Sequence, residues 1–276
     1  MELAEKTVIV TGGGRGIGRA IAAELSRRGA FVAITSRTQS QLDETAKLIE
    51  GAGGSVLAIG ADVTSRDQVL MMVRQVIEQR GKVDVLINNA GLFRSVGPVW
   101  DVDPAVWWRD VETNMLGPLL CCQAVLPGMI ANNDGIIINM CGGGADRPFL
   151  GASAYGASKT GLMRLTDTLA FELEIAGHQI QVYGFDPGLV RSEMTESVTR
   201  NAAAESWIPG MREWLEQGMD HPADESASAI AELIRISRPE ITGRIFMYNQ
   251  DFKEIGRRAA DIRARDTYQI RYLTNM

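Results

Sequence analysis

The sequence predicts one doubly wound α/β domain, in which a mostly parallel sheet of seven strands is covered by helices on both faces. Short runs of β-branched residues alternate along the 276-residue chain with longer segments of helical period. Two of these runs, VLIN and IIIN, are apolar up to a final asparagine, which is typical of strands buried on both faces of a parallel sheet. No Pro-rich or Gly-rich linker divides the chain, so we expect a single domain.

The expected strands follow one another at the spacing of βαβ units, with right-handed crossovers between them. They are TVIVTG (7–12), AFVAITSR (30–37), SVLAIGADV (55–63), VDVLINNAG (83–91), GIIINM (135–140), IQVYGFDPG (180–188) and RIFMYN (244–249). The last run completes the alternation, so we assign residues 1–251 to the domain.

Two segments lie outside this alternation. Residues 189–222 form a long connection that is more apolar than a solvated loop, and we expect this loop to cover a binding site. Residues 252–276 form a C-terminal extension with apolar residues at irregular helical spacing: Ile255, Ile262, Tyr268 and Ile270. We favour a surface helix packed on its own subunit, and an arm that reaches a partner subunit is the alternative.

Composition narrows the classes of function. The chain has 28 Lys and Arg against 34 Asp and Glu, and a net charge of −6 gives no general attraction to nucleic acid or to an anionic membrane. The N-terminus lacks the pattern of a signal peptide, so we expect a cytoplasmic protein. The three cysteines have no C-x-x-C spacing and the two histidines lie far apart, so we expect no metal site and no histidine-dependent triad.

A glycine-rich turn follows the first expected strand and begins a helix. In TGGGRGIG, Gly12, Gly16 and Gly18 fit the pattern T-G-x-x-x-G-x-G. Glycines at these positions allow the backbone to approach a pyrophosphate at the positive N-terminus of the helix. The turn therefore predicts a dinucleotide site, which also includes Gly14, Arg15 and Ile17.

The second expected strand ends in Thr35, Ser36 and Arg37, without the carboxylate that usually holds the adenosine ribose of NAD. Arg37 and Arg15 can instead bind a 2′-phosphate through charge-assisted hydrogen bonds. Two solvated arginines are the alternative interpretation. We expect NADP(H) as the cofactor rather than NAD(H), with Ser36 and Arg37 in its site.

Six motifs in register, over about residues 5–249, resemble those of the short-chain dehydrogenases/reductases of the compact, Rossmann-type, single-domain kind. The first is the glycine-rich turn. The resemblance implies further cofactor contacts at Asp62 and Val63 (adenine), at Asn89, Ala90 and Gly91 of the NNAG motif, and at Pro187, Gly188, Val190 and Ser192 (nicotinamide carboxamide). It also identifies Asn114 in TNMLG and the Y-x-x-x-K pair, Tyr155 and Lys159.

The resemblance implies hydride transfer between a nicotinamide and a ketone or secondary alcohol. Tyr155 would exchange a proton with the substrate oxygen, although an unperturbed tyrosine titrates near ~10. Lys159 and the nicotinamide cation would favour the phenolate and lower the pKa of Tyr155, and Lys159 would also hold the nicotinamide ribose. Asn114 would help to hold a water that continues the proton relay.

The sequence departs from the family where a serine normally precedes the tyrosine by about thirteen residues, because Gly142 stands there. Loss of one donor to a developing oxyanion costs on the order of ~3 kcal/mol. Backbone N–H groups of Gly142, Gly143 and Gly144, the thiol of Cys141 or a substrate hydroxyl can take its place. We favour the backbone, because glycine reaches conformations closed to other residues, and we interpret Cys141 chiefly as a small buried residue at a strand end.

The glycine run also removes bulk, which predicts a pocket opened for a fairly large, mostly apolar substrate. Its candidate contacts are Cys141, Gly142, Gly143, Phe93, Phe149 and Trp207. Asp186, before Pro187, is a second departure from the family, and it either disturbs the nicotinamide end of the cofactor or caps a loop.

These observations predict an NADP(H)-dependent carbonyl reductase or alcohol dehydrogenase, as in secondary metabolism. We expect a small-molecule substrate and a homodimer or homotetramer formed through the helices around residues 104–131 and 153–176. The alternative is a dinucleotide-binding protein of the same fold that has lost redox chemistry and acts as a scaffold, a sensor or a non-redox catalyst.

Overall fold

In the computed structural model, which describes residues 3–269, seven parallel strands form one sheet in the order β3-β2-β1-β4-β5-β6-β7. The predicted fold class is confirmed, and every described strand pair of this sheet is parallel. The strands are β1 (Thr7–Thr11), β2 (Phe31–Ser36), β3 (Ser55–Gly60), β4 (Val85–Asn88), β5 (Gly135–Met140), β6 (Ile180–Asp186) and β7 (Arg244–Met247). The strand order reverses between β1 and β4, where open α/β sheets bind ligands.

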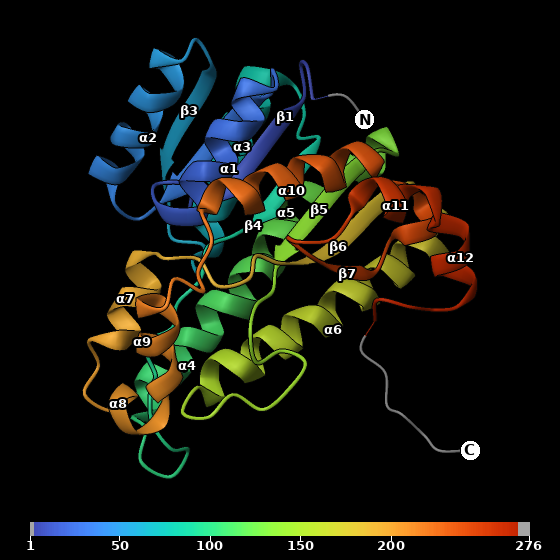
Figure 1. The fold of residues 1–276 in the computed structure, drawn as a ribbon. Coiled ribbons are helices and arrows are strands. Elements are labelled where there is room, and N and C mark those ends of the chain that lie inside the picture. Colours follow the sequence, from blue (N-terminus) through green and yellow to red (C-terminus); the bar gives the residue numbers. More distant parts are fainter. Residues whose placement is uncertain (1–2, 270–276) are drawn as a thin grey trace.

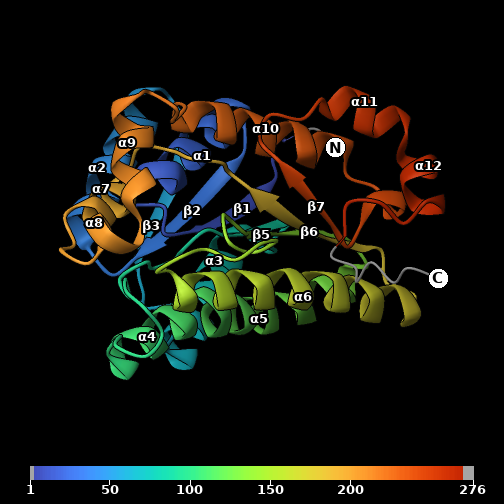
Figure 2. The ribbon, with the colours of Figure 1, turned by 60° about the horizontal axis from the view of Figure 1, so that its bottom comes forward.

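Helices cover both faces of the sheet (Figure 2). One layer contains α1 (Gly16–Arg27), α2 (Gln39–Gly51), α10 (Ala223–Ile236), α11 (Phe252–Arg257) and α12 (Ala259–Ala264). The other contains α3 (Arg66–Arg80), α4 (Pro104–Val111), the π-helical turn η1 (Glu112–Leu116), α5 (Gly117–Asn132) and α6 (Ser153–Ile175). A short 3-10 turn, η2 (Pro239–Ile241), precedes β7.

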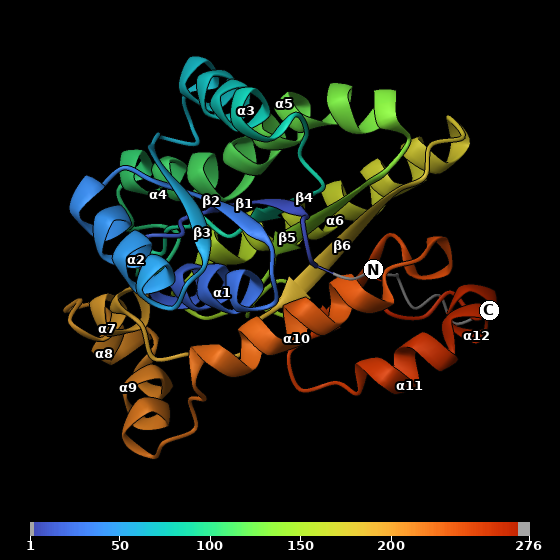
Figure 3. The same ribbon diagram turned by 90° about the horizontal axis from the view of Figure 1, so that it is seen from above.

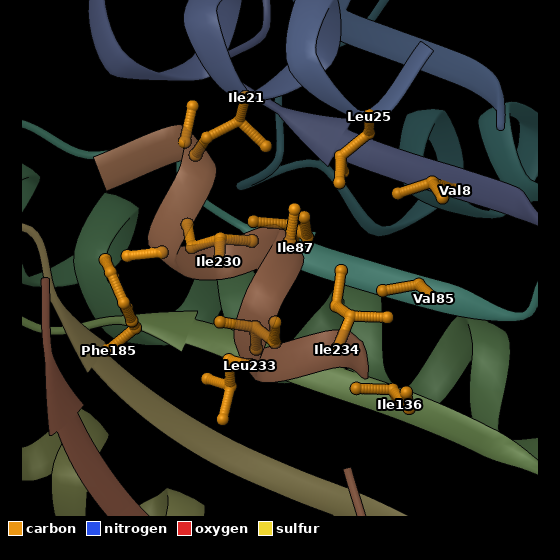
Figure 4. Packing of buried hydrophobic residues seen from close by; sticks show 14 of the residues in the cluster. Val8, Ile21, Leu25, Val85, Ile87, Ile136, Phe185, Ile230, Leu233 and Ile234 are labelled. Atoms are coloured by element: carbon orange, nitrogen blue, oxygen red, sulfur yellow. The ribbon is translucent and has the colours of Figure 1, made fainter. Parts of the chain in front are cut away.

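The larger core lies between the sheet and the pair α1 and α10 (Figure 4). Ile21 and Leu25 of α1 and Ile230, Leu233 and Ile234 of α10 are fully buried there. Their spacing of three and four residues gives each helix one apolar face. The two helices thus pack on the strands that carry the first turn of the candidate site.

Residues 189–222, predicted as a loop, fold into three short helices beyond the end of β6 (Figure 1): α7 (Glu193–Thr199), α8 (Ala204–Trp207) and α9 (Pro209–Glu216). We call this segment the cover. Its two ends are joined by a bridge between Val190 and His221 and by an ion pair between Arg191 and Asp220 at 3.2 Å. The two ends of the cover therefore lie next to each other.

The described part of the C-terminal extension packs on its own chain. Phe252, Ile255, Ala259 and Ile262 are buried in the same core cluster as α1 and α10, and Figure 3 shows α11 and α12 beside α10. This agrees with the packed interpretation, although two short helices stand where one was predicted. Ile270 lies outside the described residues.

One continuous helical segment, Pro104–Asn132, is long and apolar enough to cross a membrane by length and composition. Its inner face packs against the sheet, where Cys121, Cys122, Val125 and Met129 are buried. The core helix of a globular domain passes the same test, so the finding is weak as an indication of a membrane span.

We predict that Leu233→Ala lowers the free energy of unfolding by about 2–5 kcal/mol, because the side chain is fully buried and leaves a cavity. Leu48→Ala is the matched control, since the Leu48 side chain on α2 is half exposed, and we expect a change within about 0.5 kcal/mol. Urea unfolding curves of the two variants measure both values. Equal losses would contradict the assignment of α10 to the core.

Candidate active site

A cleft of about 470 Å³ lies at the carboxyl ends of β1 and β4, where the strand order reverses. All predicted cofactor residues except Gly188 and Val190 line this cleft: Gly12, Gly14, Arg15, Gly16, Ile17, Gly18, Ser36, Arg37, Asp62, Val63, Asn89, Ala90, Gly91, Tyr155, Lys159, Pro187 and Ser192. The structure therefore brings together residues from six separate segments of the sequence.

The glycine-rich turn has no room for a side chain at Gly12 or Gly18. A Cβ atom on Gly18 would lie 2.2 Å from the carbonyl oxygen of Gly12, and Gly12 itself has a left-handed φ of +65°. The Asn89 side chain donates hydrogen bonds to the carbonyl oxygens of Thr11 (2.9 Å) and Gly12 (3.3 Å) and so fixes the turn. Glycines at these positions, directly before α1 begins at Gly16, fit the close approach of a dinucleotide pyrophosphate.

Both arginines predicted to bind a 2′-phosphate are paired with carboxylates. Arg15 forms an ion pair with Glu193 at the start of α7, and Arg37 lies 3.8 Å from Asp62. Burial alone would raise the pKa of Asp62, but hydrogen bonds from Thr64 and the charge of Arg37 hold that pKa below its usual value. Glu193 is a contact that sequence reasoning missed, because no local pattern links the first turn to the cover.

Tyr155 and Lys159 occupy consecutive turns of α6, and both face the cleft. The Lys159 ammonium donates a hydrogen bond to the Met140 carbonyl oxygen at 2.8 Å and lies 5.5 Å from the centre of the Tyr155 ring. Burial lowers the pKa of Lys159 to about 8. The lysine is thus close to the phenol and held by the end of β5.

The pKa of the Tyr155 phenol is raised by the surroundings that the chain itself provides, whereas the resemblance implies a lowering by Lys159 together with the nicotinamide cation. Burial is the main cause, and the carboxylate of Asp186 adds to it. Lys159 does not reverse this effect, because its ammonium is directed to the Met140 carbonyl rather than to the phenol oxygen. The phenol is therefore protonated at neutral pH, as a proton donor must be.

Asn114 is fully buried in the π-helical turn, and its side chain shapes the backbone near the site. Its oxygen accepts from the Leu92 amide at 2.8 Å, and its nitrogen donates to the Leu92 carbonyl (2.9 Å) and the Ser158 hydroxyl (3.0 Å). None of these bonds reaches Tyr155 or Lys159. The Asn114 side chain thus ties the Leu92 segment to α6 beside the cleft.

The space freed by the glycine run is largely filled, contrary to the pocket predicted there. A Cβ atom on Gly142 would lie 2.7 Å from the Tyr155 phenol oxygen, and one on Gly144 would lie 2.8 Å from the Cβ of Phe149. Phe93 stacks on the Tyr155 ring, with 4.5 Å between centres and 17° between planes. Two of the glycines therefore make room for aromatic rings of the protein itself.

The Cys141 thiol and the backbone amides of the glycine run, two possible replacements for the missing serine, differ in whether they are free to donate a hydrogen bond. The Cys141 side chain is buried, its thiol donates to the Asn139 carbonyl at 3.5 Å, and burial raises its pKa to about 12. By contrast, the backbone amides of Gly142, Gly143 and Gly144 donate no hydrogen bond to any residue within 3–269. The structure thus favours the backbone over the thiol as a donor.

The turn after β6 is held by three hydrogen bonds, and the sequence did not predict that the residues making them come together. Asp186 accepts a hydrogen bond from the Gly188 amide at 2.9 Å, so it caps the turn. His221 Nε2 lies 2.7 Å from the Pro187 carbonyl oxygen, and the Ser226 hydroxyl donates to the same oxygen at 2.9 Å. These bonds fix the segment predicted to contact the nicotinamide.

The remaining predicted substrate residues form an apolar cluster beside the phenol. Phe93, Phe149 and Trp207 pack there with Ile208 and Met211 of the cover.

A second hollow, of about 610 Å³, lies between the far end of α6, β7 and α12. We exclude it as the reaction site because Tyr155 and Lys159 do not line it.

Comparison with known proteins agrees with this geometry. The family profile described as short chain dehydrogenase matches residues 6–203. The human dehydrogenase/reductase SDR family member 4 is 31% identical over 238 residues, which cover 86% of this chain and 78% of the human protein. The 3-oxoacyl-[acyl-carrier-protein] reductase of Staphylococcus epidermidis is 35% identical over 197 residues, covering 70% and 79% of the two chains.

Solved structures show the same fold. Levodione reductase superposes with a TM-score of 0.79 at 26% identity, covering 88% of this chain and 96% of its own. A metagenomic short-chain oxidoreductase in complex with NADP superposes with a TM-score of 0.70 at 30% identity, covering 87% and 94%. The fold, the cleft and these relatives together place the chain in the short-chain dehydrogenase/reductase family of oxidoreductases.

Proposed function

We propose that the protein is an NADP(H)-dependent oxidoreductase that interconverts a ketone and a secondary alcohol on a fairly large, apolar small molecule. The observation that carries this proposal is that Tyr155 and Lys159 face the cleft that the glycine-rich turn also lines. A bound nicotinamide dinucleotide supplies or accepts the hydride. The residues of the chain bind the dinucleotide, orient the substrate and exchange the proton with the substrate oxygen.

Tyr155 acts as the proton donor to the substrate oxygen in the reducing direction. Its raised pKa keeps the phenol protonated until the oxygen develops negative charge. Lys159, charged below its pKa of about 8, provides the nearby cation and donors for ribose hydroxyls. Asn114 positions the Leu92 segment that borders the cleft.

The amide of Gly143 provides the hydrogen bond that the absent serine would otherwise give. It makes no hydrogen bond within residues 3–269, and the neighbouring Gly142 lies against the phenol oxygen. A backbone N–H group that the fold holds toward a reacting oxygen needs little reorganisation during the reaction.

Arg37 and Arg15 select NADP(H) by pairing with the 2′-phosphate. Both line the cleft, and both exchange a carboxylate partner for the phosphate when the dinucleotide binds. The NADP complex of the metagenomic relative supports this choice. Asp62, which is near Arg37, is then free to contact the adenine.

The substrate side of the site is apolar. Trp100 is 82% exposed and its ring meets the Trp207 ring edge-on at 5.7 Å, so an aromatic rim lies between a surface loop and the cover. Apolar and aromatic walls favour an apolar substrate, such as an intermediate of secondary metabolism.

We also propose a cytoplasmic homodimer or homotetramer that associates through α5 and α6. Phe171 and Ile175 of α6 are 63% and 73% exposed, which is costly for apolar side chains in water. Cys121 and Cys122, by contrast, are buried in their own core and do not reach such an interface.

We predict that Tyr155→Phe lowers kcat for ketone reduction by roughly 10²- to 10⁴-fold, because the proton donor is lost. The affinity for NADPH, measured by nucleotide fluorescence, is expected to stay the same. A variant with full activity would refute the assigned role. A wild-type protein that binds NADPH yet reduces no ketone in a broad panel would support the scaffold or sensor alternative.

We predict that Arg37→Ala weakens NADPH binding by about 1.5–3 kcal/mol through loss of a charged hydrogen bond, and leaves NADH binding nearly unchanged. Dissociation constants for both dinucleotides test this. Arg147→Ala is the control, since that side chain is 81% exposed and does not line the cleft. Equal weakening of both dinucleotides in Arg37→Ala would count against 2′-phosphate recognition.

We predict that Gly143→Pro lowers kcat by roughly 10²- to 10³-fold, because proline has no N–H group. Gly143→Ala keeps the donor, and its Cβ atom would meet only a Phe149 ring carbon at 3.9 Å, so it is expected to stay active. Both variants should bind NADPH normally. Similar kcat values for the two variants would rule out the Gly143 amide as the donor.

A further inference from the structure

We infer that an aromatic stack positions the proton donor, with Phe93 as the positioning residue and Gly142 as the residue that makes room for the phenol. This inference rests on the proposed function for its catalytic meaning. Its geometric part concerns three side chains and one glycine that can be tested without any substrate.

Gly142 is the first part of the arrangement. The site of its absent side chain is occupied by the Tyr155 hydroxyl, which would lie 2.7 Å from a Cβ atom at Gly142. Such a distance is shorter than real Cβ contacts allow, so any larger residue at this position must displace the phenol. A serine here would therefore push the proton donor away rather than help it.

Phe93 is the second part. It covers one face of the Tyr155 ring at 4.5 Å, and the edge of Phe149 meets Phe93 at 5.8 Å and 69°. Such aromatic pairs have a preferred geometry and contribute beyond their buried area. Phe149 reaches this place only because Gly144 has no side chain, since a Cβ atom there would lie 2.8 Å from the Cβ of Phe149.

The backbone around Phe93 is held firmly on both sides. Before it, the Leu92 amide donates to Asn114 at 2.8 Å, and after it, the amides of Arg94 and Ser95 donate to Asp110 at 2.8 and 2.9 Å. Asn114 and Asp110 are both fully buried. These hydrogen bonds hold the backbone of Phe93 in place, and so they fix the position of its ring beside Tyr155.

No polar contact competes with this packing. Within residues 3–269 the Tyr155 phenol oxygen makes no hydrogen bond. The ring contacts Phe93 on one face and lies 5.5 Å from the Lys159 ammonium, and the oxygen occupies the space at Gly142. The shape of these surroundings therefore directs the phenol.

A double-mutant cycle tests the space at Gly142. We expect Gly142→Ala to lower the melting temperature in both the wild-type and the Tyr155→Phe backgrounds, because the φ of +158° at Gly142 strains any residue with a side chain. The loss should be larger in the wild-type background, where the phenol oxygen also clashes with the added Cβ atom. An equal loss in both backgrounds would show that the backbone of Gly142, not the phenol, excludes a side chain, and would overturn this part. The measurement needs neither substrate nor activity.

Kinetics of Phe93 variants test the positioning. We expect Phe93→Leu to lower kcat on the order of 10²-fold with KM for NADPH unchanged, because small misplacements of a reacting group are costly. Phe93→Tyr keeps the ring and should recover most of the rate. Wild-type kcat in Phe93→Leu, with Tyr155→Phe inactive, would overturn the inference and leave the proposed function intact. Full activity of Tyr155→Phe would instead overturn the proposed function.

Discussion

The parallel pairing of β1 with β4 is the constraint on which the rest of the structure depends. Val8, Ile9 and Val10 pair in register with Val85, Leu86 and Ile87, and the chain winds outward in opposite directions from this pair. Because the helices on either side of the pair lie on opposite faces, nothing covers its carboxyl end. The cleft therefore results from the topology of the backbone, and the side chains only shape and line it.

Polar side chains clamp this pair at both ends. At the amino end the buried Asp84 carboxylate accepts from the Thr7 amide at 2.9 Å and contacts Lys6 and Lys82. Burial raises the pKa of Asp84, but these lysines and hydrogen bonds outweigh it and keep that pKa below its usual value. At the carboxyl end the Thr11 hydroxyl accepts from the Asn89 and Ala90 amides. The first turn and the NNAG motif are therefore held as one rigid unit.

Much of this was predictable from the sequence because it is local. Strands and their burial follow from runs of apolar residues, and the glycine-rich turn and the pair Tyr155 and Lys159 are spacings within one turn or one helix. Contacts between distant segments were not predictable. The pairing of Arg15 with Glu193, the bond from His221 to Pro187 and the use of Asn114 to hold Leu92 all depend on where the folded chain brings separate elements.

The glycine run shows why one class of inference fails without a structure. A missing side chain in a sequence says only that a volume is free at that residue, and both a ligand and a neighbouring side chain can fill it. Tertiary packing decides between these two. In this structure the Tyr155 side chain fills the volume beside Gly142, and the Phe149 side chain fills the volume beside Gly144. Gly143, whose Cβ direction meets only an ordinary contact with Phe149, is the one of the three whose side-chain position packing leaves free. The departure from the family at Gly142 thus leaves the proton donor and its lysine in place, with the phenol packed into the space that the glycine leaves free.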